Sequence, residues 1–374
     1  MKFLHTSDLH LGRQLNEIKL LNDQKYILAQ IVKIAGSEGV DAVLIAGDVY
    51  QKASPQADAM AAFDDFVTQL TTKGIKMYII SGNHDSAQRI SYFSALLKKS
   101  GVYMSENFDG SLQRITVRDE YGEIDIWMLP FLRPVYVRRA YPEEKIESYQ
   151  DAVQVVLKNA AIDTEKRNVL LCHQFITGAE TSDSEEKSVG GLDNIDAGVF
   201  DAFDYVALGH IHKPQRVMRD TLRYAGSIMK YSLSEVEHHK SVTIVEMCRK
   251  GDIELHTVPL EPLHEMRRVE GLFEDVMNLE HSEDYVSITL HDETPPVDAQ
   301  QRLGIVFPNR IKYEVVNSKT RTDRDVLARE EMKNKTTIDL FKDFFAKSNN
   351  DVPPNEWQLN LLKQILEEME ESAE

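Results

Sequence analysis

Polar residues that could bind metal ions or transfer protons recur in the sequence, each directly after an apolar run. The eight candidates are Asp8, His10, Asp48, Asn83, His84, His173, His210 and His212. Carboxylate and amide oxygens mixed with imidazole nitrogens suit Mn, Fe or Zn better than Ca. Two such metal ions about 3.5–4 Å apart can clamp a phosphate and generate hydroxide near neutral pH. These residue types therefore predict hydrolysis of a phosphoester.

The segment Gly82-Asn83-His84-Asp85 brings four different properties together. Gly82 lets the chain turn sharply without a Cβ clash, and Asn83 offers a neutral oxygen ligand. The His84 imidazole can donate a proton or stabilise charge near neutral pH, and Asp85 can orient an imidazole. We expect this segment to lie at the centre of the site.

Each polar segment also has a structural explanation when it is considered alone. Asp8-x-His10 can be surface polarity, Gly47-Asp48 can be a turn, and His173 can be a hydrogen-bonded core residue. Five segments in this order, each directly after a predicted strand, favour one shared site over separate structural roles.

Apolar runs and helical periodicity alternate over the first part of the chain. They predict strands at 2–7, 40–46 and 75–80 and helices at 20–37 and 55–72. Strand, helix, strand, helix, strand is typical of an α/β layer with parallel strands. The candidate residues then follow the carboxyl ends of strands, where α/β folds place their sites.

The next part of the chain is richer in predicted strands. The predicted elements are an antiparallel pair at 111–117 and 123–129, a helix at 148–161, strands at 168–172 and 204–208, short strands near 215 and 222, and strands at 241–247 and 253–259. The predicted fold class is α/β, with two packed sheets flanked by helices.

Length and composition indicate a globular protein with a sizeable core. The chain has 374 residues, enough for two domains and an appendage, of which 42% are hydrophobic and 28% charged. It contains no run of the ~18 apolar residues that a membrane span needs, and its start shows no secretory signal. We expect a cytoplasmic protein in which Cys172 and Cys248 are reduced core residues.

The net charge of −18 comes from 43 basic and 61 acidic residues. This balance argues against a protein that holds nucleic acid by its overall charge. A nuclease stays open, because a local positive patch, bound divalent metals or a basic partner could attract DNA.

Taken together, the polar segments resemble those of a known superfamily. Asp8-x-His10, Gly47-Asp48, Gly82-Asn83-His84-Asp85, His173 and Gly209-His210-x-His212 resemble the calcineurin-like metallophosphoesterases, over about the first 260 residues. Segments 3–13, 129–134 and 224–227 resemble one branch of them, the SbcD family of bacterial nuclease subunits.

The resemblance implies two divalent metal ions, expected to be Mn²⁺. One would be held by Asp8, His10, Asp48 and His212, and the other by Asp48, Asn83, His173 and His210, so that Asp48 bridges them. His84 would not be a ligand; it would stabilise the pentacovalent phosphate or protonate the leaving oxygen. Asp85 would either orient His84 or only cap the turn. Some relatives carry a second functional histidine where this chain has Gln51, which leaves open whether any residue shares the role of His84.

The resemblance also implies an activity and an assembly. The activity would be hydrolysis of DNA phosphodiesters in repair, recombination and replication, as an exonuclease on double-stranded ends and an endonuclease on single strands and hairpins. The partner would be an SbcC-type coiled-coil ATPase, with a homodimer inside a heterotetramer, cytoplasmic and associated with the nucleoid.

Two other functions remain as alternatives. A stand-alone phosphodiesterase or phosphatase for small phosphoesters is disfavoured by the roughly one hundred residues that follow the catalytic domain. A non-catalytic scaffold of the same fold is disfavoured by the complete set of ligand residues.

Two segments of the first domain could contact DNA. Arg133, Arg138 and Arg139, with Tyr136 and Tyr141 interleaved, form its most basic short run. Arginines pair with phosphates and aromatic rings stack on unpaired bases, although a solvated surface loop would have the same composition. Residues 177–194 are rich in Ser, Glu, Gly and Asp, and we expect a long mobile loop that gates the site or is simply disordered.

The predicted domains are a nuclease domain at 1–262, a capping domain at 263–318, a linker at 319–336 and partner-binding helices at 337–374. For the capping domain the sequence predicts helices at 270–279 and 298–304 and strands at 285–290 and 311–316. It resembles a domain that helps to shape and bind DNA in the nuclease family; a purely structural lid is the alternative.

Two amphipathic helices are predicted after the charged linker. Their apolar stripes are Ile338, Phe341, Phe344 and Phe345, and then Trp357, Leu361, Leu362, Ile365 and Met369. Two short helices cannot bury both stripes completely against each other, so we expect a partner surface to cover them. Docking onto the same chain is the alternative.

Overall fold

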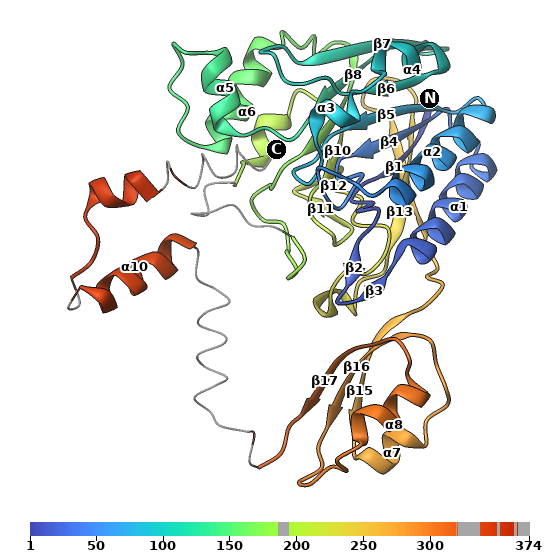
Figure 1. The fold of residues 1–374 in the computed structure, drawn as a ribbon. Helices are drawn as coiled ribbons and strands as arrows, with labels where there is room; N and C mark the ends of the chain where they lie inside the picture. Colours follow the sequence, from blue (N-terminus) through green and yellow to red (C-terminus); the bar gives the residue numbers. More distant parts are fainter. Residues whose placement is uncertain (186–193, 319, 321–336, 350–351, 363–364, 366–374) are drawn as a thin grey trace. The chain divides into compact units, whose positions relative to one another are not determined.

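The computed structural model describes residues 1–185, 194–318, 320, 337–349, 352–362 and 365. These residues divide into two compact units, the first ending at Met266 and the second beginning at Arg267 (Figure 1). The predicted linker, apart from Thr320, lies outside the described residues, as do residues 186–193 of the predicted loop and residues 363–364 and 366–369 of the second predicted C-terminal helix. No helix of the described part is long and apolar enough to cross a membrane.

The first sheet of the first unit has six strands in the order β14-β13-β1-β4-β5-β6. Their bounds are β1 (Lys2–Thr6), β4 (Ala42–Ala46), β5 (Lys76–Ile80), β6 (Val102–Met104), β13 (Ser241–Met247) and β14 (Ile253–Pro259). Strands β1, β4, β5 and β6 are parallel, whereas β13 pairs antiparallel with β1 and β14 antiparallel with β13. The carboxyl ends of the parallel strands therefore share one edge.

The second sheet also has six strands, in the order β11-β12-β10-β9-β8-β7. Their bounds are β7 (Gln113–Asp119), β8 (Gly122–Leu129), β9 (Arg167–His173), β10 (Tyr205–Gly209), β11 (Gln215–Val217) and β12 (Arg219–Tyr224). Strands β8, β9, β10 and β12 are parallel, and β7 and β11 pair antiparallel at the two edges.

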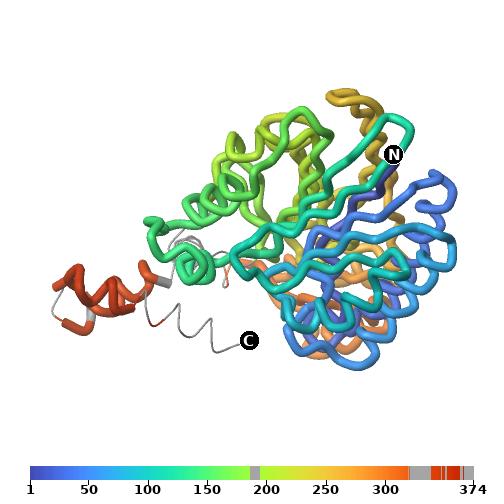
Figure 2. Tube along the Cα trace, turned by 90° about the horizontal axis from the view of Figure 1, so that it is seen from above, coloured from blue at the N-terminus to red at the C-terminus, as the bar shows by residue number. Residues whose placement is uncertain are grey.

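The two sheets face each other, and a helix pair covers each outer side (Figures 1 and 2). Helices α1 (Leu21–Ser37) and α2 (Ala57–Thr72) lie on the first sheet, and α5 (Pro134–Ala140) and α6 (Tyr149–Asn159) lie on the second. Between the sheets, Phe3 and Tyr78 pack with Ile126, Leu171 and other fully buried side chains in one core. This core keeps the carboxyl ends of the two sets of strands close together.

Short elements connect these layers. They are β2 (Gln14–Leu15), β3 (Ile18–Lys19), α3 (Ala87–Ile90), α4 (Ser94–Leu97), η1 (Lys98–Ser100), η2 (Ala197–Phe200) and η3 (Leu233–Glu235). A capping box starts α6: the Ser148 hydroxyl accepts the Asp151 N–H (3.1 Å), and the Asp151 carboxylate accepts the Ser148 N–H (3.0 Å). The ends of the predicted mobile loop are joined by a bridge between Ile176 and Ile195.

The second unit contains a small sheet in the order β15-β16-β17. Its elements are β15 (Met266–Gly271), α7 (Phe273–Met277), β16 (Tyr285–Leu290), α8 (Ala299–Val306) and β17 (Arg310–Val315). Strands β16 and β17 are parallel, and buried Phe273, Val286, Leu303 and Phe307 contribute to a core of their own. Beyond it, α10 spans Thr337–Ser348, and residues 356–362 are helical.

The predicted α/β class with two packed sheets is confirmed, and one predicted element needs correction. The helix predicted at 270–279 begins only at Phe273, because residues 266–271 form strand β15. Leu272 has extended backbone angles, and the Phe273 N–H donates to Asp292 Oδ2 at 2.7 Å. Cys172 is buried as predicted and Cys248 is only partly buried; both are free thiols.

Candidate metal centre

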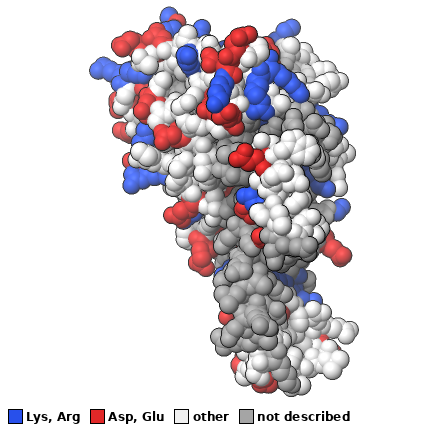
Figure 3. Space-filling view, turned by 90° about the vertical axis from the view of Figure 1, so that its left-hand side faces the viewer, with Lys and Arg blue, Asp and Glu red and all other residues white. Residues whose placement is uncertain are grey.

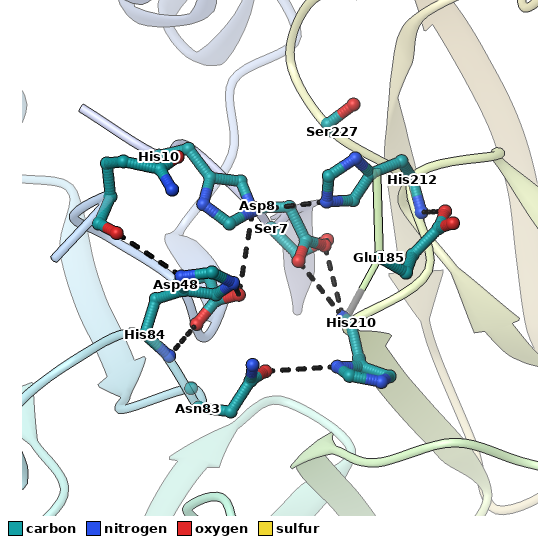
Figure 4. Close-up of polar contacts among 12 residues, drawn as sticks. Ser7, Asp8, His10, Asp48, Asn83, His84, Glu185, His210, His212 and Ser227 are labelled. Carbon is teal, nitrogen blue, oxygen red and sulfur yellow. Dashed lines mark hydrogen bonds and ion pairs between the residues drawn. The ribbon is translucent and has the colours of Figure 1, made fainter. Parts of the chain in front are cut away.

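The candidate residues converge from the ends of strands in both sheets. Asp8 follows β1 and Asp48 follows β4, while Asn83 follows β5 of the same sheet. His173 is the last residue of β9, and His210 follows β10 of the second sheet. Figure 4 shows the side chains of Asp8, Asp48, Asn83 and His210 gathered around one site. The structure thus brings all the predicted residues into one site.

Four of the candidate residues have a backbone conformation that side chains other than glycine rarely adopt. The φ angles are 52° at Asp8, 43° at His10, 50° at Asp48 and 100° at His210. Such residues cost of order 1–3 kcal/mol each and persist where the surroundings hold them in place. Backbone bonds do so here: the Asp8 N–H donates to the Gly47 carbonyl and the His10 N–H to the Asp48 carbonyl, each at 3.0 Å.

Three glycines leave room for the ligands. A Cβ at Gly47 would lie 2.3 Å from His173 Nδ1, and one at Gly82 would lie 2.1 Å from Asp48 Oδ1. At Gly209 a Cβ would lie 1.9 Å from the Ala46 carbonyl oxygen. No side chain fits at these distances, so the glycines of these segments are required by close approach.

One part of the site is formed by Asp8, His10 and His212, whose ligand atoms all lie within 4.8 Å of one another. The two histidine Nε2 atoms are 3.1 Å apart. His10 Nε2 is also 3.5 Å from Asp48 Oδ2. The Asp8 carboxylate accepts the Ser7 hydroxyl at 2.6 Å and the His210 backbone N–H at 3.1 Å, which fixes its orientation.

The other part is formed by Asn83, His173 and His210. Asn83 Oδ1 lies 3.1 Å from His173 Nε2 and 3.0 Å from His210 Nδ1. His173 Nε2 is 3.4 Å from Asp48 Oδ2, the same oxygen that His10 approaches. Asp48 therefore lies between the two parts, where a bridging ligand would lie.

The donor set fits divalent cations. Asp8 is fully buried and Asp48 is only 2% exposed, and buried carboxylates require nearby positive charge. The Ala46 carbonyl accepts a hydrogen bond from His173 Nδ1 at 2.7 Å, so Nε2 is the nitrogen that can serve as a ligand. Burial lowers the pKa of His173, but the adjacent Asp48 carboxylate outweighs this effect and raises it to about 9. The centre of the site therefore attracts positive charge.

His84 lies at the margin of the cluster. Its Nε2 is 3.9 Å from Asp48 Oδ2, and its side chain is 11% exposed. His84 Nδ1 lies 3.2 Å from the backbone carbonyl of Gln51. His84, His10 and Asp48 nevertheless form a third group whose ligand atoms lie within 4.8 Å of one another.

Asp85 interacts with the backbone. Its carboxylate accepts N–H groups from Val49 (3.0 Å), Tyr50 (2.9 Å) and Gly82 (3.0 Å). Of the two roles open from the sequence, these contacts support capping. The carbonyl of Gln51, rather than a carboxylate, contacts His84 Nδ1, and the Gln51 side chain accepts Arg13 Nη1 at 3.2 Å.

Several supporting residues were not predicted. Gln24 on α1 donates its amide to the carbonyls of Leu9 and His10 at 3.1 and 2.7 Å. The Glu185 carboxylate accepts the His212 N–H at 2.8 Å, and Glu235 lies 3.2 Å from His212 Nδ1. Each is a single polar residue well separated in sequence from its partner, and no local pattern marks it.

The arginine-rich run contains helix α5, with Arg133 at its N-cap and Tyr141 at its C-cap, so it is not the surface loop considered as the alternative. Arg138 donates to the Ile146 carbonyl at 3.1 Å, so this side chain also braces the segment after the helix. On the face drawn in Figure 3, basic and acidic side chains are interspersed. Whether α5 contacts DNA stays a prediction.

Comparison with known proteins gives the family. The calcineurin-like phosphoesterase family matches residues 1–214, and a family described as type 5 capsule protein repressor C-terminal domain matches residues 262–349. Because the first match spans more than half of the 374 residues, the chain belongs to the calcineurin-like phosphoesterase family. Its similarity to the two relatives below places it among the SbcD nuclease subunits of that family.

The first relative is the SbcD component of the SbcCD nuclease of Staphylococcus epidermidis. It is 33% identical over 320 residues, which cover 83% of this chain and 84% of the relative. The second relative is the corresponding SbcD component from Staphylococcus saprophyticus, 30% identical over 351 residues, covering 91% and 92%. Among solved structures, a dimetal phosphatase from Danio rerio aligns with 70% of this chain and 99% of its own, at 11% identity and a TM-score of 0.41.

Proposed function

We propose that this chain is the nuclease subunit of an SbcCD-type complex and hydrolyses DNA phosphodiester bonds with two divalent metal ions. The observation that supports this most directly is the position of Asp48. Its Oδ2 lies between His10 and His173, at 3.5 and 3.4 Å from their Nε2 atoms, so one carboxylate can serve two metal ions. The similarity to two SbcD nuclease components over most of the chain supports DNA as the substrate.

The ligand roles follow the two parts of the site. Asp8, His10, Asp48 and His212 would hold one metal ion, and Asp48, Asn83, His173 and His210 the other. Metal ions of this kind, which we propose to be Mn²⁺, polarise a phosphate and supply hydroxide near neutral pH.

His84 would be the catalytic residue. The Gln51 carbonyl accepts a hydrogen bond from its Nδ1 and leaves Nε2 on the side of Asp48. The His84 side chain is 11% exposed, and we propose that the substrate reaches the ring from this side. From there the imidazolium could stabilise charge on the phosphate or protonate the leaving oxygen.

We assign residues 1–262 to the nuclease domain, 263–318 to a capping domain, 319–336 to a linker and 337–374 to helices that bind the partner. The partner would be a coiled-coil ATPase of the SbcC type in a heterotetramer with two nuclease chains, in the cytoplasm. The expected substrates are double-stranded ends, single strands and hairpins.

An assay with three substrates tests this function. Purified protein, alone and with the ATPase, is incubated with Mn²⁺ and linear duplex DNA, single-stranded DNA or a small chromogenic phosphodiester. We expect cleavage of DNA that EDTA abolishes and added Mn²⁺ restores. Cleavage of the small ester alone, with DNA intact even in the presence of the ATPase, would instead indicate a stand-alone phosphodiesterase. Inactivity toward all three would indicate a scaffold.

A further inference from the structure

A buried ion pair lies directly behind His212. Glu235, the last residue of η3, is fully buried, and Lys240, just before β13, is only 6% exposed. Lys240 Nζ and Glu235 Oε2 are 2.5 Å apart. Neither residue is among the proposed metal ligands, and the proposed reaction does not use them.

The pair contacts His212 on both its ring and its backbone. Glu235 Oε1 lies 3.2 Å from His212 Nδ1, and the Ser184 hydroxyl, 2.8 Å from the same nitrogen, donates to this Oε1. Lys240 Nζ donates to the His212 carbonyl at 2.8 Å. Lys240 also donates to the Ser227 hydroxyl at 2.7 Å. The three N–H groups of the ammonium thus have three acceptors, Glu235, His212 and Ser227. The ion pair is arranged as a clamp on one ligand.

Stability alone is a poor explanation for such a pair. Removing two charges from water costs as much as their attraction returns, and well-packed apolar residues of similar volume are often equally stable. A carboxylate behind an imidazole has a defined chemical effect, however. It keeps the proton on Nδ1, leaves the Nε2 lone pair facing the site, and makes that nitrogen a better ligand.

His212 differs in this respect from its neighbours in the described structure. The Nδ1 atoms of His173 and His84 face the neutral backbone carbonyls of Ala46 and Gln51. His10 Nδ1 is buried and has no hydrogen-bond partner among the described residues. A full negative charge therefore lies behind Nδ1 of His212. The adjacent ring is that of His10, whose Nδ1 has no hydrogen-bond partner among the described residues.

We propose that Glu235, held in place by Lys240, is a positioning residue that fixes the tautomer of His212 and strengthens the metal site formed with Asp8 and His10. The inference rests on the proposed two-metal function. It predicts that the two metal sites have different dependence on Glu235: the site containing His212 weakens when the carboxylate is lost, and the site containing Asn83 and His173 does not.

The test is a Mn²⁺ titration of metal-free protein, in which binding is measured by calorimetry and by electron paramagnetic resonance. Glu235→Gln keeps the shape of the side chain and removes its charge. We expect one of the two Mn²⁺ sites to bind about 10–100-fold more weakly, with the second unchanged. DNA cleavage by Glu235→Gln should need correspondingly more Mn²⁺ and approach the wild-type kcat at saturation.

Two further variants make the result decisive. Glu265→Gln removes a Glu–Lys pair with Lys230 (2.7 Å) whose carboxylate is 44% exposed, and should titrate like wild type. If Glu235→Gln does not fold, Glu235→Gln/Lys240→Met removes both charges together and is titrated in its place. Weakened binding of one Mn²⁺ supports the inference.

Two outcomes overturn the inference, and they are distinguishable from failure of the proposed function. If wild type binds two Mn²⁺ and the Glu235 variant that folds binds both within twofold of it, the clamp has no role in metal binding. The same holds if the variant is only less stable to urea. If wild type binds no Mn²⁺, the two-metal function itself fails.

Discussion

Oδ2 of Asp48 lies 3.4 Å from Nε2 of His173, although Asp48 follows β4 of one sheet and His173 ends β9 of the other. The contact therefore depends on the packing of one sheet against the other, and the core between the sheets helps to determine metal binding. A substitution in that core that shifts the sheets should weaken the metal site without touching it.

Asp48→Ala should lose both metal ions, because the carboxylate lies beside ligands of both sites. Metal content of the purified variant, measured by plasma mass spectrometry, checks this. Loss of one ion only would contradict a bridging role.

His84→Ala should keep its metal content near wild type and lose hydrolysis by on the order of 10²-fold or more, the effect of removing an acid or charge stabiliser. The same metal analysis and a DNA-cleavage rate at saturating Mn²⁺ are the measurements. Metal loss equal to that of Asp48→Ala would show that the group formed by His84, His10 and Asp48 binds a metal.

Replacing Arg133 and Arg139 together by alanine should weaken DNA binding and flatten its dependence on salt, because fewer phosphate contacts release fewer counterions. Arg138 is left intact, since its bond to the Ile146 carbonyl makes its loss a structural change as well. Fluorescence anisotropy at several salt concentrations measures the slope. Hydrolysis of a small phosphodiester is the control, and an equal loss there would mean that the arginines support the fold.

The C-terminal helices should bind the ATPase. Phe344 and Trp357 are each 69% exposed and Leu361 is 39% exposed, and aromatic anchors at an interface commonly contribute about 2 kcal/mol or more each. Phe344→Ala/Trp357→Ala should therefore abolish co-purification with the ATPase, as should a chain ending before α10. Both should retain Mn²⁺-dependent cleavage of single-stranded DNA. Near-normal binding of the ATPase would assign the helices to an intramolecular role.

Low pH should lower the free energy of unfolding of the first unit, because the Asp119 carboxylate becomes protonated. Arg167, which is 3% exposed, and the amino group of Met1 bond its carboxylate and hold its pKa well below the ordinary value. The folded state thus binds fewer protons, so this stabilisation is present above pH ~4 and decreases as the pH falls.

Asp119→Asn should lower the free energy of unfolding by about 2–3 kcal/mol at pH 7, because it leaves Arg167 without its charged partner. The difference from wild type should shrink toward pH 3. Urea unfolding at several pH values measures it, with the exposed Glu143→Gln as control. A difference independent of pH would mean that the pair acts through shape and not through charge.

Local patterns were sufficient to predict most elements of the first unit and to identify the polar residues at strand ends that come together in one site. Apolar runs identify β4 and β5, and the polar residues that follow them in sequence also follow them in space. Such local patterns do not identify contacts between residues that are far apart in the sequence. Nothing near Glu235 in sequence shows that its side chain faces His212, and β15 has too irregular an alternation of buried and exposed residues to be distinguished from a helix start.

The left-handed backbone at Asp8, His10, Asp48 and His210 has a consequence for protein engineering. Glycine adopts positive φ without the steric penalty that other residues incur. Replacing His10 by glycine should therefore relieve local strain while removing a proposed metal ligand, and the metal-free variant should melt at a higher temperature than metal-free wild type. A screen for heat resistance alone would select against the catalytic centre, because the residues that make this protein an enzyme are among those that make its fold less durable.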